Sequence, residues 1–222
     1  MLKRFLFILI FLLPVSITGF AQMPEAIDLG LSVKWASFNL GAAEPYQLGN
    51  FYAWGETTHK SWFDWSNYKW GQPGHLTKYD SKAVEGEGYH FLHLELQDDA
   101  AHTVLGGKWR MPTTDEAKEL LKNCEWAWVC VNGIYGYQGT SKINGNRIFL
   151  PPQLPQGESH ERLGAVVLWT AGNNGKYHPN DAACIVLMYN YFFSTHNEKE
   201  RQRIFIRGEA RMTGYPIRAV KP

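Results

Sequence analysis

Beyond its first residues, the sequence lacks an apolar run long enough to cross a membrane, since a spanning helix needs about 20 such residues. It also lacks an excess of either charge: 22 Lys and Arg stand against 21 Asp and Glu, for a formal net charge of +1. A near-neutral chain gives no electrostatic reason to expect nucleic acid or an anionic membrane as a partner. We therefore expect neither partner, and no membrane span beyond the N-terminus.

Cysteine is scarce, with only Cys124, Cys130 and Cys184, which excludes a dense disulfide framework. Because the number is odd, at least one thiol has no partner within the chain. Cys124 and Cys130 are not expected to pair, since the extended chain between them spans roughly 20 Å and a disulfide needs Cα atoms within about 7 Å. Cys184 could pair with either one, but we favour three small buried hydrophobic residues.

The common catalytic motifs are missing too. There is no G-x-S-x-G nucleophile turn, no phosphate-binding loop and no dinucleotide fingerprint. The best group of metal-ligand residue types is His90, His93, Asp98, Asp99 and His102. This stretch has no clear helical period, so we expect its two aspartates to accept bonds from backbone amides in a loop. We assign no catalytic residue, no metal ligand and no cofactor.

The N-terminus has the pattern of a secretory signal peptide. Lys3 and Arg4 precede an apolar stretch at 5–15, and Gly19 and Ala21 are small residues at the −3 and −1 positions of a cleavage site. We predict a signal peptide at 1–21, with an uncleaved anchor as the alternative. Export would leave the mature chain periplasmic, on the cell surface or extracellular, with a formal charge of −1 once Lys3 and Arg4 are removed.

One helix is strongly indicated, at 114–123. Thr113 is a natural N-cap, and Glu116 three residues later completes a capping box. Ala117, Leu120, Leu121 and Cys124 recur at helical spacing, so one stripe should face the core. Before the helix, Gly106 and Gly107 are expected to turn the chain, and Trp109 and Arg110 to point inward as scaffold.

The rest of the chain indicates strands. Asn132-Gly133 and Asn144-Gly145 are type I′ hairpin signals between strands at 125–131, 134–140 and 147–150. Further strands are expected at 27–38, 51–54, 164–170, 182–193, 203–207 and 215–220. The sequence therefore predicts one α+β domain at 22–222, with mainly antiparallel sheet, one or two short helices and long loops.

Six segments of the chain, in order, carry a resemblance to a known family. They are IDLGLSVKWASFNLGA at 27–42, NFYAWGE at 50–56, DDAAHTVLGGKWRMPT at 98–113, NGIYGY at 132–137, NGNRIFLPP at 144–152 and GYPIRAV at 214–220. Together they resemble the Fibrobacter succinogenes major paralogous domain family of secreted Bacteroidetes proteins. The resemblance implies a C-type lectin-like fold, shared with formylglycine-generating-enzyme-like domains, in which a compact sheet presents functional loops. One departure is LWTAG at 168–172, where many relatives have a serine-rich segment.

Neither chemistry implied by that fold finds its residues here. The formylglycine-generating reaction needs a pair of reactive cysteines near the C-terminal region, and only Cys184 is present there, in an apolar strand that should raise its pKa. The tripeptide signatures of calcium-dependent lectins are absent, and Asn173, Asn174, Asn180 and Asp181 are expected to form turns. An enzyme of this fold is thus the weakest of the functional alternatives.

The remaining functional candidate is an aromatic-rich insertion at about 56–97. Within it Trp62, Trp65, Tyr68 and Trp70 are separated by polar residues, a composition suited to stacking on sugar rings or holding a peptide. The alternative is that these rings fold the loop onto the scaffold. A second candidate surface contains Tyr191 and His196. We predict a secreted, non-enzymatic binding module for a glycan or a surface protein, or alternatively a structural or adhesin subunit of a surface assembly.

Overall fold

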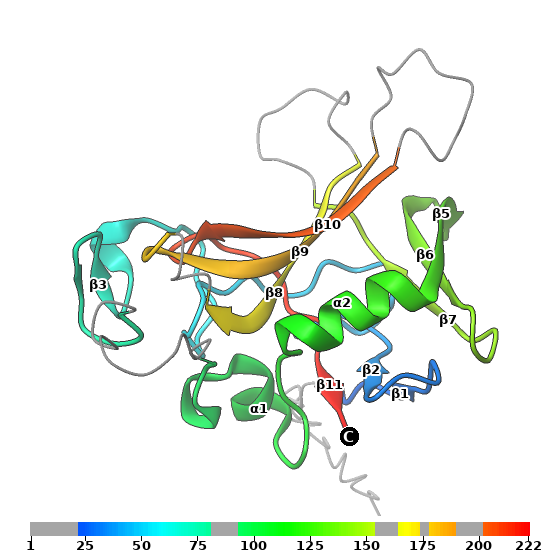
Figure 1. The fold of residues 1–222 in the computed structure, drawn as a ribbon, viewed down its shortest axis with the longest axis horizontal. Coiled ribbons are helices and arrows are strands. Elements are labelled where there is room, and N and C mark those ends of the chain that lie inside the picture. The colour runs from blue at the N-terminus through cyan, green and yellow to red at the C-terminus, as the bar shows by residue number, and fades with distance from the viewer. Residues whose placement is uncertain (1–21, 81–92, 154–163, 174–177, 190–201) are drawn as a thin grey trace, which may run out of the picture.

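The structure, a computed structural model, describes residues 22–80, 93–153, 164–173, 178–189 and 202–222 (Figure 1). The predicted signal peptide at 1–21 lies outside this part of the chain. At the centre is an antiparallel sheet of β8 (Val166–Asn173), β9 (Asp181–Tyr189) and β10 (Gln202–Ala210), in the order β10-β9-β8. A register shift between Trp169 and Asn173 bends β8 near its end.

Both faces of β8 and of most of β9 are buried, so the molecule has two cores. Alternate side chains of a strand point to opposite faces, and here Trp169 and Cys184 enter one core while Leu168 and Ile185 enter the other. The first core is completed by Tyr52, Trp54, Ala101, Trp109 and Met111, and the second by Trp35, Leu120, Tyr137, Ile148 and Leu150. Burial on both faces explains why β8 is apolar along nearly its whole length.

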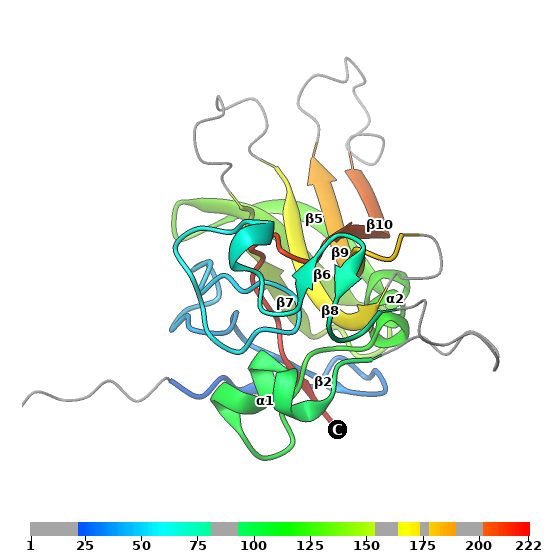
Figure 2. The ribbon, with the colours of Figure 1, turned by 90° about the vertical axis from the view of Figure 1, so that its left-hand side faces the viewer.

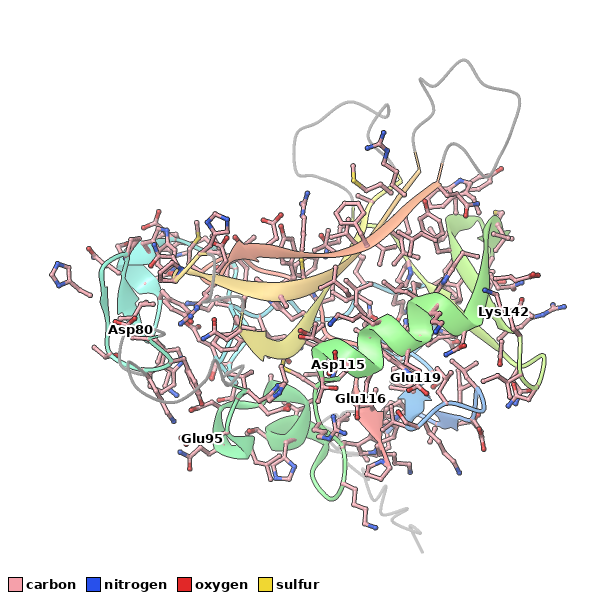
Figure 3. All side chains as sticks on the ribbon, viewed as in Figure 1. Asp80, Glu95, Asp115, Glu116, Glu119 and Lys142 are labelled. Carbon is pink, nitrogen blue, oxygen red and sulfur yellow. The ribbon has the colours of Figure 1, made fainter. Side chains whose placement is uncertain are left out.

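The predicted helix is confirmed as α2 (Thr114–Asn123). Thr113 Oγ1 accepts from the N–H of Glu116, and the Glu116 carboxylate accepts from the N–H of Thr113, which is the expected capping box. Figure 3 shows Asp115 and Glu116 at the first turn of the helix. Glu116 also pairs with Arg110, so Arg110 is scaffold as predicted. Burial opposes ionisation of Glu116, but these bonds outweigh it and lower the pKa of Glu116.

A second sheet follows α2, with β5 (Cys124–Val131), β6 (Ile134–Ser141) and β7 (Arg147–Leu150) in that order. Asn132 and Gly133 have φ of 49° and 80°, which confirms the first two-residue turn. The second signal, Asn144-Gly145, was wrong about the type of turn. Only Gly145 has a positive φ, and the strands are connected by the longer stretch 142–146. The Ser141 hydroxyl accepts from the N–H groups of Ile143 and Asn144, and these bonds hold the wider loop.

The terminal segments form shorter strands than the sequence predicted. β1 (Ala26–Ile27), β2 (Lys34–Ala36) and β11 (Val220–Lys221) make a small sheet in the order β1-β2-β11. The strand predicted at 27–38 is interrupted because the chain turns at Gly30, where φ is 72°. The strands predicted at 51–54 and 215–220 reduce to a single Tyr52–Tyr215 bridge and to β11.

The remaining short elements are η1 (Trp65–Asn67), β3 (Gly71–Gln72), β4 (His75–Leu76), η3 (Leu96–Asp98) and α1 (Ala100–Leu105). In Figure 1, η1 and the β3–β4 hairpin lie at the left-hand end of the central sheet and α1 lies below the sheet; Figure 2 views the molecule from that end. The α+β class with mainly antiparallel sheet is therefore confirmed. Of the helices described, none is long and apolar enough to span a membrane.

Arg218 ties the C-terminal segment to the rest of the fold. Its guanidinium is fully buried and donates to Asn39 Oδ1 at 2.8 Å, to the carbonyl oxygens of Ala36 and Ser37 at 3.1 Å each, and to that of Phe149 at 2.9 Å. Burial lowers the pKa of Arg218 to about 9, which still leaves it charged at neutral pH. The arginine of the GYPIRAV segment is thus a structural residue.

The three cysteines are free thiols, in line with the expectation for Cys124 and Cys130. Burial raises the pKa of Cys124 to about 11 and that of Cys184 to about 12, so neither thiol is activated. The prediction that all three are buried was wrong for Cys130, which is exposed on β5. It lies on the same face of β5 as Trp126 and Trp128, which pack on the second core, but nearer the end of the β5–β6 hairpin, beyond that core.

Candidate functional site

The aromatic loop, defined here as residues 56–80, is anchored through its inward-facing rings. Tyr68 is 5% exposed, and its hydroxyl donates to the carbonyl oxygen of Trp54 at 2.8 Å. Trp70 is half-buried, and its Nε1 donates to the carbonyl oxygen of Gly55 at 2.9 Å. Trp54 itself is fully buried and donates to the carbonyl oxygen of Thr170 in β8. The loop is therefore connected to the central sheet through Trp54.

A buried carboxylate joins the start of the loop to its middle. Glu56 is 6% exposed, and its Oε1 accepts from the backbone N–H of Lys69 at 2.8 Å and from Lys60 Nζ at 2.9 Å. Lys60 Nζ also donates to the carbonyl oxygen of Asn67 at 2.8 Å. Since a buried carboxylate is costly unless paired and hydrogen-bonded, these bonds fix the path of the chain between Glu56 and Lys69.

The turn between Glu56 and Lys69 has its own capping box. Asp64 is the N-cap of η1 and accepts from the N–H of Ser66, while Asn67 Oδ1 accepts from the N–H of Asp64. The backbone and hydroxyl bonds from Ser66 lower the pKa of Asp64. Asn67 Nδ2 then donates to the carbonyl oxygen of Trp62. Trp62, the exposed aromatic residue of the loop, is thus hydrogen-bonded to a turn whose own residues are bonded to one another.

The four aromatic residues predicted as ligand contacts take different places. Trp62 is 58% exposed and projects from the anchored loop. Trp65 is half-buried and packs edge-on against Tyr68, with ring centroids 5.5 Å apart. Tyr68 has no ring face left for a ligand, because it is enclosed by the scaffold, and we correct that assignment. Trp70 packs edge-on against Tyr79, and Lys69 Nζ lies 4.1 Å from its ring centroid, so it too is mainly an anchor.

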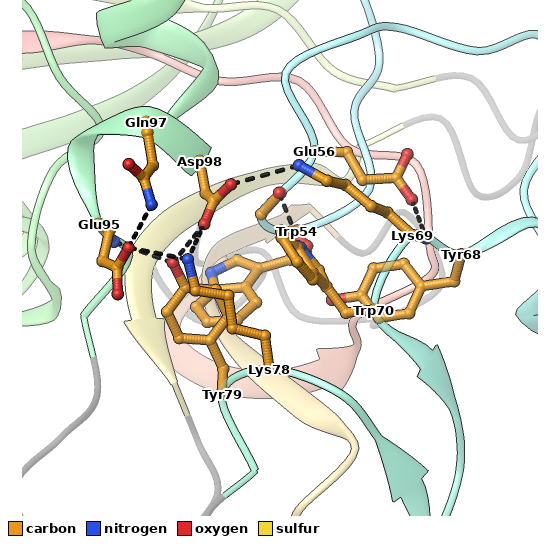
Figure 4. A network of polar contacts seen from close by, with 11 residues as sticks. Trp54, Glu56, Tyr68, Lys69, Trp70, Lys78, Tyr79, Glu95, Gln97 and Asp98 are labelled. Atoms are coloured by element: carbon orange, nitrogen blue, oxygen red, sulfur yellow. Dashed lines mark hydrogen bonds and ion pairs between the residues drawn. The ribbon is translucent and has the colours of Figure 1, made fainter.

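A polar cluster joins the loop to η3 (Figure 4). Asp98, 3% exposed, accepts from Lys78 Nζ at 2.6 Å, from the Tyr79 hydroxyl at 2.7 Å and from Lys69 Nζ at 3.3 Å. Glu95 accepts a further bond from Lys78 at 2.8 Å. Burial opposes ionisation of Asp98, but the bonds from Lys78, Tyr79 and Lys69 outweigh it and hold the pKa of Asp98 below its usual value.

We predict that this cluster makes stability acid-sensitive. A carboxyl whose pKa is lowered in the folded state binds fewer protons there than in the unfolded chain, so its contribution is complete above about pH 4 and is lost as pH falls further. The change Asp98→Asn should lower the free energy of unfolding by about 1–3 kcal/mol at neutral pH. The difference from wild type should then shrink as pH falls below 4, as measured by urea denaturation at a series of pH values.

The control for that series is Asp115→Asn, because Asp115 is exposed and its ion pair is with Lys118 in the same helix. A wild-type to Asp98→Asn difference that is independent of pH between 5 and 3 would contradict the assigned role of the carboxylate charge.

Tyr79 is held in an unusual backbone conformation. Its φ is 59°, in the left-handed region that a bulky side chain seldom adopts. Its hydroxyl bonds to Asp98, its carbonyl oxygen accepts from Asn173 Nδ2 at 3.2 Å, and its ring lies edge-on to Trp54 with centroids 5.2 Å apart. Burial raises the pKa of Tyr79 to about 12. Several contacts thus keep one strained residue, and the end of the loop, in a single conformation.

The best metal-like group of the sequence has structural roles where it is described. Asp99 is the N-cap of α1 and accepts from the N–H groups of His102 and Met111, as predicted. For Asp98 the prediction was wrong, because its partners include the Lys and Tyr side chains rather than the expected backbone amides alone. His93 is exposed, and His90 lies outside the described residues. Over the described ranges, no three His, Cys, Asp or Glu side chains gather as metal ligands.

Residues near the expected calcium-type loop surround a buried arginine instead. Arg211 is fully buried; its Nη2 donates to Asn173 Oδ1 at 3.0 Å and its Nε to the carbonyl oxygen of Asp181 at 3.3 Å. Its guanidinium carbon lies 5.0 Å from the ring centroid of Trp54. Burial lowers the pKa of Arg211, against the opposing influence of nearby Tyr68 and acidic groups. Asn173 and Asp181 are therefore scaffold, and Asn174 lies outside the described residues.

A small open depression lies beside this arginine. Its lining consists of Gly74, Leu76, Asp80, Pro179 and Asn180. Among the described residues, no aromatic ring contributes to that lining, so they do not provide there the stacking surface that the sequence suggested. The second predicted surface, with Tyr191 and His196, lies outside the described residues.

The sequence did not reveal the residues that organise the loop. Glu56 and Asp98 are an ordinary glutamate and aspartate in the sequence, and Lys78 and Tyr79 have no motif around them. Their roles depend on partners up to 94 residues away, such as Asn173 bonding to Tyr79. Comparison with known proteins gives no relative for this arrangement: no family model, no curated protein and no solved structure matches the chain.

Proposed function

We propose that this protein is a secreted, non-enzymatic binding module that uses the aromatic loop to contact a glycan. The scaffold would be a C-type lectin-like variant of the Fibrobacter succinogenes major paralogous domain type, exported by the signal peptide at 1–21 to the periplasm, the cell surface or the medium. The six sequence segments at 27–220 support the family, and the mainly antiparallel α+β architecture is compatible with it.

The observation that carries the proposal is a single exposed tryptophan on an anchored loop. Trp62 is 58% exposed, while Tyr68, Glu56 and Asn67 in the same loop are fixed by bonds to the backbone. An indole presented on a preorganised backbone loses little conformational freedom when a ligand stacks on it. Ser61 is exposed beside Trp62 and adds a hydroxyl that suits the polar rim of a sugar ring.

Binding should depend on Trp62. The change Trp62→Ala is expected to weaken glycan binding by about 10- to 100-fold, the cost of removing one central aromatic contact, without changing thermal stability. The measurement is a glycan-array screen of the mature protein, followed by calorimetric titration of the glycans that bind. Trp62→Phe should retain part of the affinity, because a ring remains for stacking.

The matched control is Tyr135→Ala on β6, since Tyr135 has a similar exposure of 56% away from the loop. Equal affinities of wild type and Trp62→Ala for every glycan that binds would exclude the loop as the contact. A signal that appears only with envelope proteins, and survives periodate oxidation of their glycans, would instead assign a surface protein as ligand.

A structural or adhesin subunit is the second candidate function. The observation that favours it is β10, the outer strand of the central sheet, whose far edge no described strand pairs with, so that it is open to a strand of another chain. Size-exclusion chromatography of the protein from its native envelope distinguishes the two: a stable complex with a different protein supports the subunit, whereas a free module that binds glycan supports the first proposal.

A further inference from the structure

The outer strand of the central sheet has an open edge within the described residues. β10 pairs only with β9, and Figures 1 and 2 both show no described element on its other side. The N–H of Arg211 donates to the carbonyl oxygen of Asn180, which continues the ladder beyond the Ala210–Asp181 pair. Because hydrogen-bonding direction alternates along an antiparallel strand, Ile204, Ile206 and Gly208 direct their backbone groups away from β9.

Apart from the charged side chains on one face, this edge carries little of the protection usual for long exposed strands. It is nine residues long, contains no proline, and keeps an unbroken register with β9 from Gln202 to Ala210. Natural edge strands are commonly short, bulged or interrupted by proline, because an open ladder recruits further strands. A long regular edge in a native protein therefore indicates a surface that pairs with something.

We propose that β10 pairs with β10 of a second copy of this chain, antiparallel and about a twofold axis. One register overlaps all nine residues, and it places Ile206 opposite Ile206 of the second copy, with Ile204 opposite Gly208. These are the residues whose backbone groups point outward, so the register also satisfies the direction of the ladder bonds. The two central sheets would then join into one continuous sheet, as in isologous dimers.

The charges of β10 select a second copy as the occupant. Arg203, Phe205, Arg207 and Glu209 project from one face of the strand. In the full-overlap register Arg203 lies opposite Glu209 of the second copy and Arg207 opposite Phe205, which gives two ion pairs and two cation–aromatic contacts. Slipping by one repeat in either direction instead sets Arg203 against Arg207, or Arg207 against Arg207, which repel.

The charged side chains of this set are accessible on the face of the sheet, while Phe205 is half-buried and packs against the first core. Arg203 is exposed, and Arg207 is 42% and Glu209 23% exposed while they pair with each other. A second arginine approaching Glu209 would extend this pair into a network rather than bury an isolated charge. Pairing of this kind is independent of the aromatic loop, which lies at one end of the strand (Figure 1).

The test uses the mature chain and charge reversal. Sedimentation equilibrium of the wild type should show a monomer–dimer equilibrium, and Arg203→Glu and Glu209→Arg should each weaken self-association by at least tenfold, since each sets like charges opposite one another. An equimolar mixture of the two variants should recover association, because the mixed dimer restores both ion pairs. Native mass spectrometry would identify that dimer by its mass.

The control is Arg147→Glu, which makes the same change in charge at an exposed position of β7 and should leave association unaltered. A wild type that stays monomeric at its highest soluble concentration overturns the proposal. So does a dimer that is unaffected by Arg203→Glu, which would place the interface elsewhere. If Arg203→Glu and Glu209→Arg do not associate when they are mixed, this register is rejected.

Discussion

Replacing Arg218 with methionine is expected to lower the free energy of unfolding by about 3–5 kcal/mol, since each buried acceptor left without a donor costs about 1–3 kcal/mol and several are affected. Methionine fills much of the space but donates no hydrogen bond. Asn39 Oδ1 and the carbonyl oxygens of Ala36, Ser37 and Phe149 would lose their common donor, and all of these acceptors except that of Ser37 are buried. Unsatisfied buried acceptors account for most of the expected loss.

Urea denaturation followed by tryptophan fluorescence measures this effect, with Arg147→Met as the control because Arg147 is exposed. The exposed change should stay within about 0.5 kcal/mol of wild type. Arg218→Lys should recover little of the lost stability. A single ammonium group lacks the fork of the guanidinium and cannot reach acceptors on both β2 and β7. A loss of less than about 1 kcal/mol for Arg218→Met would show that the terminal segment is held mainly by its apolar contacts.

Truncating Trp54 should lower the free energy of unfolding nearly as much as Arg218→Met does, and it should also affect the aromatic loop. The change Trp54→Ala removes a fully buried ring, for which the usual cost is about 3–5 kcal/mol. It also removes the donor to Thr170 and the ring against which Tyr79 and Arg211 pack. Because the loop is connected to the sheet through this residue, we expect its backbone to become more mobile while the central sheet persists.

Hydrogen exchange separates those two consequences. In Trp54→Ala, the amides of Lys69 and Asn67 should exchange faster than wild type by more than the global loss of stability explains, and the amides of β9 should not. Trp54→Phe is the matched control: it keeps an aromatic ring, loses the bond to Thr170, and should cost about 1–2 kcal/mol. Uniform acceleration of exchange throughout the protein would mean that the loop unfolds only together with the sheet.

The features that sequence alone predicted are those decided by neighbouring residues. The helix at 114–123 was found to the residue because its cap, its capping partner and its apolar stripe all lie within twelve positions. The Asn132-Gly133 turn was found for the same reason. Asn144-Gly145 misled because a distant contact intervenes: Ser141, whose hydroxyl donates to the carbonyl oxygen of Leu29, organises a longer loop there.

The candidate site was predictable as a segment but not residue by residue. Composition located the aromatic loop, yet Trp62 and Tyr68 are both aromatic residues among polar ones, and nothing local distinguishes the exposed ring from the buried one. Their difference arises from Trp54, whose carbonyl oxygen receives the Tyr68 hydroxyl. Likewise the role of Arg218 could not be predicted from charge pairing in the sequence, because three of its acceptors are backbone carbonyl oxygens.

The division of the aromatic loop into anchored and exposed positions has a consequence for variation. The bonds that define the loop use Glu56, Asp64, Asn67 and Tyr68, while Ser61 and Trp62 contribute exposed side chains. Substitutions at the exposed positions should therefore change the surface that the loop presents with little cost in folding. Such a loop is suited to diversification, in a lineage of related proteins or in a library built on this scaffold.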